Sequence, residues 1–156
     1  MSERSKANPS TIELKIPVEP NMELVATNAM DVIAKHIGLS EEKAAETSMA
    51  IIEAIINAFE YADSNKDIYV NFIMSPDKLT VKVIDQGTGF ESSEVKLPNI
   101  DEKMQKGENK RGWGISLIKE LVDVVQFESK PSGTTVTMIK HKFNELKNQQ
   151  QANNEN

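Results

Sequence analysis

The chain contains no cysteine, and this absence excludes a disulfide framework and any metal site built from thiolates. No apolar run approaches the ~20 residues that a membrane-spanning helix needs, so we expect no membrane among its partners. The N-terminal segment MSERSKANPS is polar and lacks the apolar stretch of a signal peptide. Together these absences predict a cytoplasmic protein.

The chain also has fewer basic than acidic residues, and its formal net charge is -6. A protein that binds the phosphate backbone of nucleic acids carries a basic stripe, so we expect no direct nucleic-acid partner. The length of 156 residues suits one domain with its own hydrophobic core.

Composition divides the chain into parts. Residues 1–10 are polar and are predicted to form a flexible N-terminus, and residues 143–156, which end in NQQQANNEN, are predicted to form a disordered tail. Residues 11–142 carry the apolar patterns of a folded domain. Within them, residues 90–111 are polar and weakly periodic, which is typical of a lid, a binding loop or a disordered segment, and we interpret them as a lid.

Apolar periodicity predicts an α+β fold. Alternation over residues 11–18 indicates a half-buried strand, and Pro17 within it favours an edge position. A helix is predicted over residues 22–37, ended by Gly38, and Ser40 is the predicted N-cap of a second helix. A hairpin, the lid, a third helix and two further strands follow. We therefore expect a two-layer sandwich in which a mixed, mostly antiparallel sheet packs on three helices.

Polar residues on the second helix form the first candidate site. Glu53, Asn57 and Glu60 are spaced by four and three residues, so all three share one face of this helix. Such a row is either a solvated stripe or the wall of a pocket. We prefer the solvated stripe for Glu60 and the pocket wall for Glu53 and Asn57.

The segment VIDQGTGF forms the second candidate site. An apolar strand ends at Asp85, and Gly87 and Gly89 follow, which let the backbone turn tightly and approach a ligand. A carboxylate in this position can accept a hydrogen bond from an amine such as that of adenine. The plain alternative is a β-turn, which the pattern D-x-G-x-G does not exclude.

The segment RGWGIS forms the third candidate site. Gly112 and Gly114 open a helix, where free backbone N–H groups and the helix dipole favour an anion, and Arg111 adds a charge. The spacing is not that of a Walker phosphate-binding loop.

Read in order, the chain carries E-x-x-x-N on a helix, D-x-G-x-G after a strand, a polar lid, G-x-G opening a helix and GTT before a final strand. Over residues 11–142 this order resembles the Bergerat-fold ATPases, the superfamily of gyrase, heat-shock chaperone ATPases, histidine kinases and mismatch-repair ATPases. The short length and the ending RGWGISLIKELVDVV…GTTVTMIK are similar to those of small bacterial anti-sigma factors that are also serine protein kinases.

The resemblance implies a role for each matching residue. Asn57 would coordinate Mg²⁺ bridging the phosphates of ATP, and Glu53 would be the catalytic general base. Asp85 would bind the adenine amine. Thr134 would complete the adenine contact, although Thr135 could compete for that role.

The resemblance also implies roles for the glycines, which allow the backbone to lie close to the nucleotide. Gly87 and Gly89 would let the chain pass close to the base. Gly112 and Gly114, with the lid and the charge of Arg111, would hold the phosphates.

The function implied by the resemblance is that of an ATP-dependent serine protein kinase and anti-sigma factor. Its partners would be a small anti-sigma factor antagonist as the phosphorylated substrate, a sigma factor, and a second copy of the chain in a homodimer. The alternative is a non-catalytic, nucleotide-binding interaction protein that regulates a transcription factor. A third reading, an ATPase motor or a detached histidine-kinase catalytic domain, is disfavoured because transducer and phosphoacceptor segments are missing.

Overall fold

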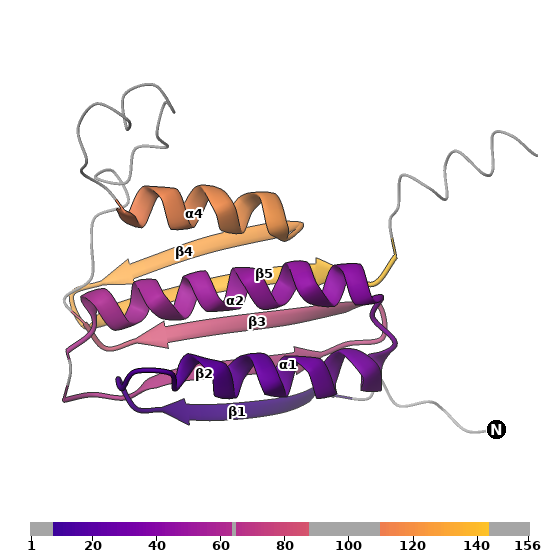
Figure 1. Ribbon diagram of the computed structural model, residues 1–156, viewed down its shortest axis with the longest axis horizontal. Helices are drawn as coiled ribbons and strands as arrows, with labels where there is room; N and C mark the ends of the chain where they lie inside the picture. The colour runs from indigo at the N-terminus through magenta and orange to yellow at the C-terminus, as the bar shows by residue number, and fades with distance from the viewer. Residues whose placement is uncertain (1–7, 64, 88–109, 144–156) are drawn as a thin grey trace, which may run out of the picture.

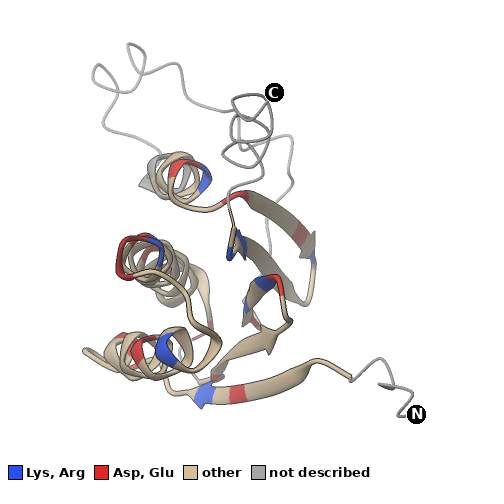
Figure 2. Ribbon diagram, turned by 90° about the vertical axis from the view of Figure 1, so that its right-hand side faces the viewer, with Lys and Arg blue, Asp and Glu red and all other residues tan. Residues whose placement is uncertain are grey.

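Helices α1, α2 and α4 lie side by side on one face of a five-stranded sheet (Figure 1). The computed structural model describes residues 8–63, 65–87 and 110–143. Viewed along the layers, the helices stack on one side, and within the described residues the opposite face of the sheet carries no helix (Figure 2). The predicted two-layer α+β sandwich is therefore confirmed.

The strands follow the order β1-β2-β3-β5-β4, and each of these neighbouring pairs is antiparallel. The predicted hairpin of β2 and β3 is confirmed, and a second hairpin joins β4 to β5. The strands are β1 (Ser10–Ile16), β2 (Ile68–Met74), β3 (Lys78–Asp85), β4 (Val124–Lys130) and β5 (Gly133–His141).

Strand β1 lies at the edge of the sheet, as predicted from Pro17 within the expected strand over residues 11–18. The strand ends at Ile16 rather than at residue 18, because Pro17 has no N–H group to continue the ladder. In register, Leu14 pairs with Val70 and Ile16 with Ile68. This register turns the apolar side chains of β1 toward the helices.

Helices α1 (Glu23–Ile37) and α2 (Glu41–Tyr61) begin and end close to the predicted positions. Gly38 has a left-handed φ of 75°, and its N–H donates to the Ala34 carbonyl. The Ser40 hydroxyl accepts the Lys43 N–H at 3.2 Å, which confirms the predicted N-cap. Apolar side chains of both helices pack on the sheet, with a fully buried core that includes Met30, Ile51, Ile55, Phe72, Val81 and Ile118.

Helix α4 (Lys110–Leu121) starts earlier than expected. The last two residues of the predicted lid, 110 and 111, are helical, so the helix begins two residues before Gly112, the first of the two glycines predicted to open it. The rest of the predicted lid lies outside the described residues, as do residues 1–7 and 144–156 of the predicted termini. Within the described part of the chain, no helix has the length and apolar character needed to cross a membrane.

Candidate functional site

Strand β3 delivers a carboxylate into the interior between sheet and helices. Asp85 is only 7% exposed and pairs in register with Thr134 on β5. Its Oδ1 atom accepts two backbone N–H groups, from Gly87 at 2.9 Å and from Thr134 at 3.3 Å. These donors compensate for removing the charge from water. Among the described residues, Oδ2 accepts no hydrogen bond, so it can accept one from a ligand.

Two glycines allow the backbone to close tightly around this carboxylate. A Cβ atom on Gly87 would collide with the Tyr61 carbonyl oxygen at the end of α2. A Cβ atom on Gly133 would collide with the Asp85 carbonyl oxygen, and Gly133 also has a φ of 148°. Gly133 had no predicted role, although its place directly before Thr134 in the GTT segment was a signal.

Asn57 on α2 lies directly beneath α4. A Cβ atom on Gly114 would stand 2.5 Å from the Asn57 Nδ2 atom, so a side chain at position 114 would displace the Asn57 amide from this place. Glu53 lies on α2 one turn before Asn57 and is half-buried, whereas Glu60 is exposed, as expected of a solvated residue. The chain thus brings a half-buried carboxylate and a half-buried amide to the α4 side of α2.

A small cavity joins three of the predicted site residues. Asn57, Asp85 and Thr134 come from α2, β3 and β5, and they line one space of about 20 Å³. That volume holds about one water molecule, so a purine requires the walls to separate. The remaining lining residues are apolar: Ala54, Ala58, Val83, Ile115, Phe127 and Val136.

Those apolar walls were missed in the sequence analysis. Ile115 comes from α4, and Phe127 from the edge strand β4. Phe127 alternates with exposed residues along β4, a pattern that places it on the helix side of the sheet. An apolar slot with a few convergent polar groups is typical of a small-molecule site.

A second cavity, of about 460 Å³, lies at the turn between β4 and β5. Asp85 and Gly87 line this space too, together with Lys66 and Lys130. Thr135 lines it, whereas Thr134 lines the small cavity with Asn57. The two threonines considered for the adenine contact therefore line different cavities: Thr134 lines the small one and Thr135 the larger one.

The other predicted residues divide between α4 and the undescribed segment. Arg111 and Gly112 belong to the first turn of α4, close in sequence to Gly114. Gly89 lies outside the described residues. Of these residues, Gly114 brings α4 close to Asn57. The phosphate-binding roles of Arg111, Gly112 and Gly114 stay predictions.

The donor set suits a magnesium-bound nucleotide. No group of three or more His, Asp or Glu among the described residues could hold a metal ion. Mg²⁺ prefers oxygen ligands and keeps several waters, so one amide oxygen together with phosphate oxygens is a chemically reasonable set. Asn57 supplies such an oxygen, and Asp85 supplies the acceptor that an adenine amine needs.

Comparison with known proteins gives a consistent picture. The model of a family described as the histidine kinase-like ATPase domain matches residues 18–140. The serine-protein kinase RsbW of Bacillus velezensis is 31% identical over 136 residues, which cover 83% of this chain and 84% of that protein. The anti-sigma F factor of Caldanaerobacter subterraneus subsp. tengcongensis is 28% identical over 134 residues, which cover 83% of this chain and 92% of that protein.

Solved structures share the fold. The RsbU and RsbW domains of Rv1364c from Mycobacterium tuberculosis superpose with a TM-score of 0.63 at 19% identity, covering 84% of this chain and 32% of that longer one. The catalytic domain of the histidine kinase ThkA gives a TM-score of 0.51 at 14% identity, covering 85% of this chain and 97% of that one. At such identities the likeness concerns the arrangement of helices on the sheet.

Proposed function

The chain belongs to the family of histidine kinase-like ATPase domains, and from this membership we propose that it is an ATP-dependent serine protein kinase and anti-sigma factor. One observation supports the nucleotide site above all: Asn57, Asp85 and Thr134, from three separate elements, line a single cavity. The relatives named serine-protein kinase and anti-sigma F factor support the choice within the family.

In this proposal the adenine of ATP enters between α2 and the sheet. Asp85 accepts a hydrogen bond from the exocyclic amine through Oδ2, while Oδ1 stays bound to the two backbone N–H groups. Thr134, on the neighbouring strand, contacts the base directly or through water. Gly87 lets the backbone turn close to the end of α2, and Gly89 leaves room for the purine.

The phosphates lie toward the start of α4. Gly112, in the first turn, presents its backbone N–H group to them, and Gly114 lets α4 approach Asn57, with the positive end of the helix dipole and the charge of Arg111 adding attraction. Asn57 would hold a magnesium ion through its amide oxygen. Bound Mg²⁺ would neutralise phosphate charge that develops during transfer.

Phosphoryl transfer needs a base and a correctly placed acceptor. Glu53 accepts the proton of a serine hydroxyl on the substrate protein as that oxygen forms a bond to the γ-phosphorus. The bond from the γ-phosphorus to the bridging oxygen breaks, and ADP leaves. Glu53 lies one turn from Asn57 on α2, so the base and the metal ligand share one rigid element.

The proposed partners rest on the resemblance to anti-sigma factors that are also serine protein kinases, and relatives with these two names support it. The substrate is a small anti-sigma factor antagonist, and the unphosphorylated antagonist competes with a sigma factor for the chain. We further propose that the protein acts in the cytoplasm and forms a homodimer. In such a partner-switching system, phosphorylation of the antagonist leaves the kinase free to sequester the sigma factor.

Incubation of the purified protein with Mg-ATP and a candidate antagonist tests the catalytic part of this proposal. Mass spectrometry should locate one phosphate on a serine of the antagonist. Saturable ATP binding without phosphate on any tested antagonist would favour the non-catalytic interaction protein instead. The same reaction with GTP is the control, because an adenine-specific site should discriminate against it.

A further inference from the structure

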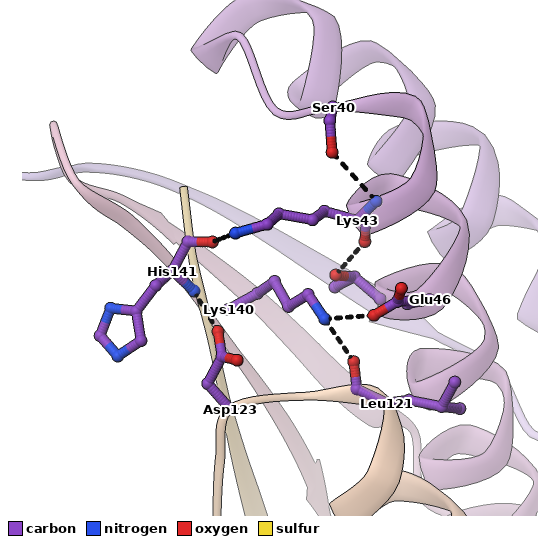
Figure 3. A network of polar contacts seen from close by, with 8 residues as sticks. Ser40, Lys43, Glu46, Leu121, Asp123, Lys140 and His141 are labelled. Carbon is purple, nitrogen blue, oxygen red and sulfur yellow. Dashed lines mark hydrogen bonds and ion pairs between the residues drawn. The ribbon is translucent and has the colours of Figure 1, made fainter. Parts of the chain in front are cut away.

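A buried lysine fastens the end of α4 that lies away from Gly114 (Figure 3). Lys140 on β5 is only 6% exposed. Its Nζ atom donates to Glu46 Oε2 on α2 at 2.6 Å and to the Leu121 carbonyl at 2.7 Å. Leu121 is the last residue of α4, so the ammonium group meets the negative end of the helix dipole.

Further hydrogen bonds secure the same corner. Asp123, just after α4, donates its N–H to the Ile139 carbonyl at 3.0 Å and accepts the His141 N–H at 2.6 Å through Oδ2. Lys43 on α2 donates to the His141 carbonyl at 2.8 Å. Figure 3 shows the two bonds of His141, to Asp123 and to Lys43, beside those of Lys140 to Glu46 and Leu121.

The two ends of α4 rest on one face of α2. Glu46, Glu53 and Asn57 are spaced by seven and four residues, so they share a helix face. At one end Gly114 packs on Asn57, and at the other Lys140 ties Leu121 to Glu46. One contact therefore lies on the Gly114 side of α4 and one at its last residue, and both bear on the tilt of α4 relative to α2.

That tilt matters because α4 forms part of the candidate site. Ile115 is a wall of the small cavity that Asn57 and Asp85 line, and that cavity must widen to admit a purine. Because α4 is held at Leu121, its other end, near Gly114, can move while the helix stays packed on the sheet.

We propose that Lys140 is a positioning residue for nucleotide binding: through Glu46 and the Leu121 carbonyl it holds α4 so that Gly114 lies over Asn57. The inference rests on the proposed nucleotide site. A buried ion pair is by itself weak support for stability, because desolvation offsets much of the attraction. The expected effect of Lys140 is therefore on the placement of α4 and on ATP affinity.

The test uses Trp113, which lies in α4 and is the only tryptophan of the chain. Iodide quenching of its fluorescence is measured without nucleotide, and ATP affinity is measured by calorimetry. Lys140→Met removes the ammonium group and keeps most of the stem, while Lys140→Arg keeps a cation with donors. Lys15→Met is the matched control, because it breaks the exposed ion pair to Asp67 on the far edge of the sheet.

We expect Lys140→Met to change the quenching of Trp113 and to weaken ATP binding by about tenfold, with Lys140→Arg restoring most of both. Lys15→Met should change neither. A folded Lys140→Met protein with unaltered quenching and an ATP affinity within about twofold of wild type would overturn the proposal.

A second variant and the wild-type titration cover the two cases in which Lys140→Met alone gives no answer. If Lys140→Met does not fold, Glu46→Gln replaces it, because Gln keeps an acceptor for Lys140 and removes only the charge. A smaller change in quenching and affinity of the same sign is expected, and none would contradict the proposal. If the wild type binds no ATP, the nucleotide site fails, whereas the quenching measurement still decides whether Lys140 places α4.

Discussion

Gly114 of α4 lies so close to Asn57 of α2 that a Cβ atom on the glycine would stand 2.5 Å from the Asn57 Nδ2 atom. Real Cβ atoms do not make contacts this short, so a larger residue must displace the amide or the helix. The contact joins the proposed phosphate-binding turn to the proposed metal ligand. It also gives a direct way to test whether their spacing matters.

Gly114→Ala should destabilise the protein despite the better helix propensity of alanine. Propensity alone would stabilise α4 by about 1 kcal/mol, whereas overpacking against Asn57 costs about 1–3 kcal/mol. We expect a net loss in the free energy of unfolding, measured by urea denaturation. A variant more stable than wild type would contradict this expectation and show that the Asn57 amide moves aside at little cost.

The double variant Asn57→Ala with Gly114→Ala supplies the control. Removal of the amide makes room for the new methyl group, so the second substitution should cost less in the Asn57→Ala background than in wild type. A double-mutant cycle on unfolding free energies measures this coupling. Additive effects would contradict the contact.

Gly133→Ala should be among the most destabilising glycine substitutions in the chain. Its φ of 148° is strained for alanine, and the new Cβ atom would collide with the Asp85 carbonyl oxygen. We expect a loss of at least about 2 kcal/mol in unfolding free energy. Gly38→Ala is the matched control: its φ is also positive, but its nearest neighbour is the flexible end of Lys142 at 3.4 Å, so it should lose less.

Asp85→Asn should weaken ATP binding at least about tenfold, which corresponds to about 1.4 kcal/mol. The amide oxygen can keep the N–H groups of Gly87 and Thr134, but the NH₂ group then offers donors where adenine needs an acceptor. Calorimetric titration measures the change. Asp77→Asn, on an exposed turn, controls for the loss of one negative charge, and equal affinities in both variants would exclude the adenine contact.

Glu53→Gln should separate binding from chemistry. The substitution keeps the shape of the side chain and removes its basicity, so phosphate transfer to the antagonist should fall by about 100- to 10,000-fold. ATP affinity should stay close to that of wild type. Glu60→Gln on the same helix is the control, since Glu60 is exposed. An active Glu53→Gln kinase would remove the general-base assignment.

Most helix ends and strand pairs of the fold could be predicted from local signals in the sequence. Gly38 and Ser40 bound their helices as predicted, because caps depend on neighbouring residues only. Alternation placed β2 and β3 as a hairpin. The predicted start of α4 was two residues too late, because the polar residues before Gly112 carry no apolar periodicity that would mark them as helical.

Contacts between distant segments were not predictable in the same way. The close approach of Gly133 to Asp85 depends on the pairing of β3 with β5, which the sequence pattern does not specify. Lys140 looked like one of several lysines near the end of the chain. Its burial follows from its parity with Thr134 and Met138 on β5, and its partner Glu46 lies far away in sequence.

Calorimetric titration of the purified protein with ATP, in buffer with and without Mg²⁺, tests the central claim most directly. We predict saturable binding of one nucleotide per chain, strengthened by Mg²⁺ in wild type and insensitive to Mg²⁺ in Asn57→Ala. Absence of a saturable signal for both ATP and ADP in magnesium buffer would contradict the claim that α2, β3, β5 and α4 together form an adenine-nucleotide site.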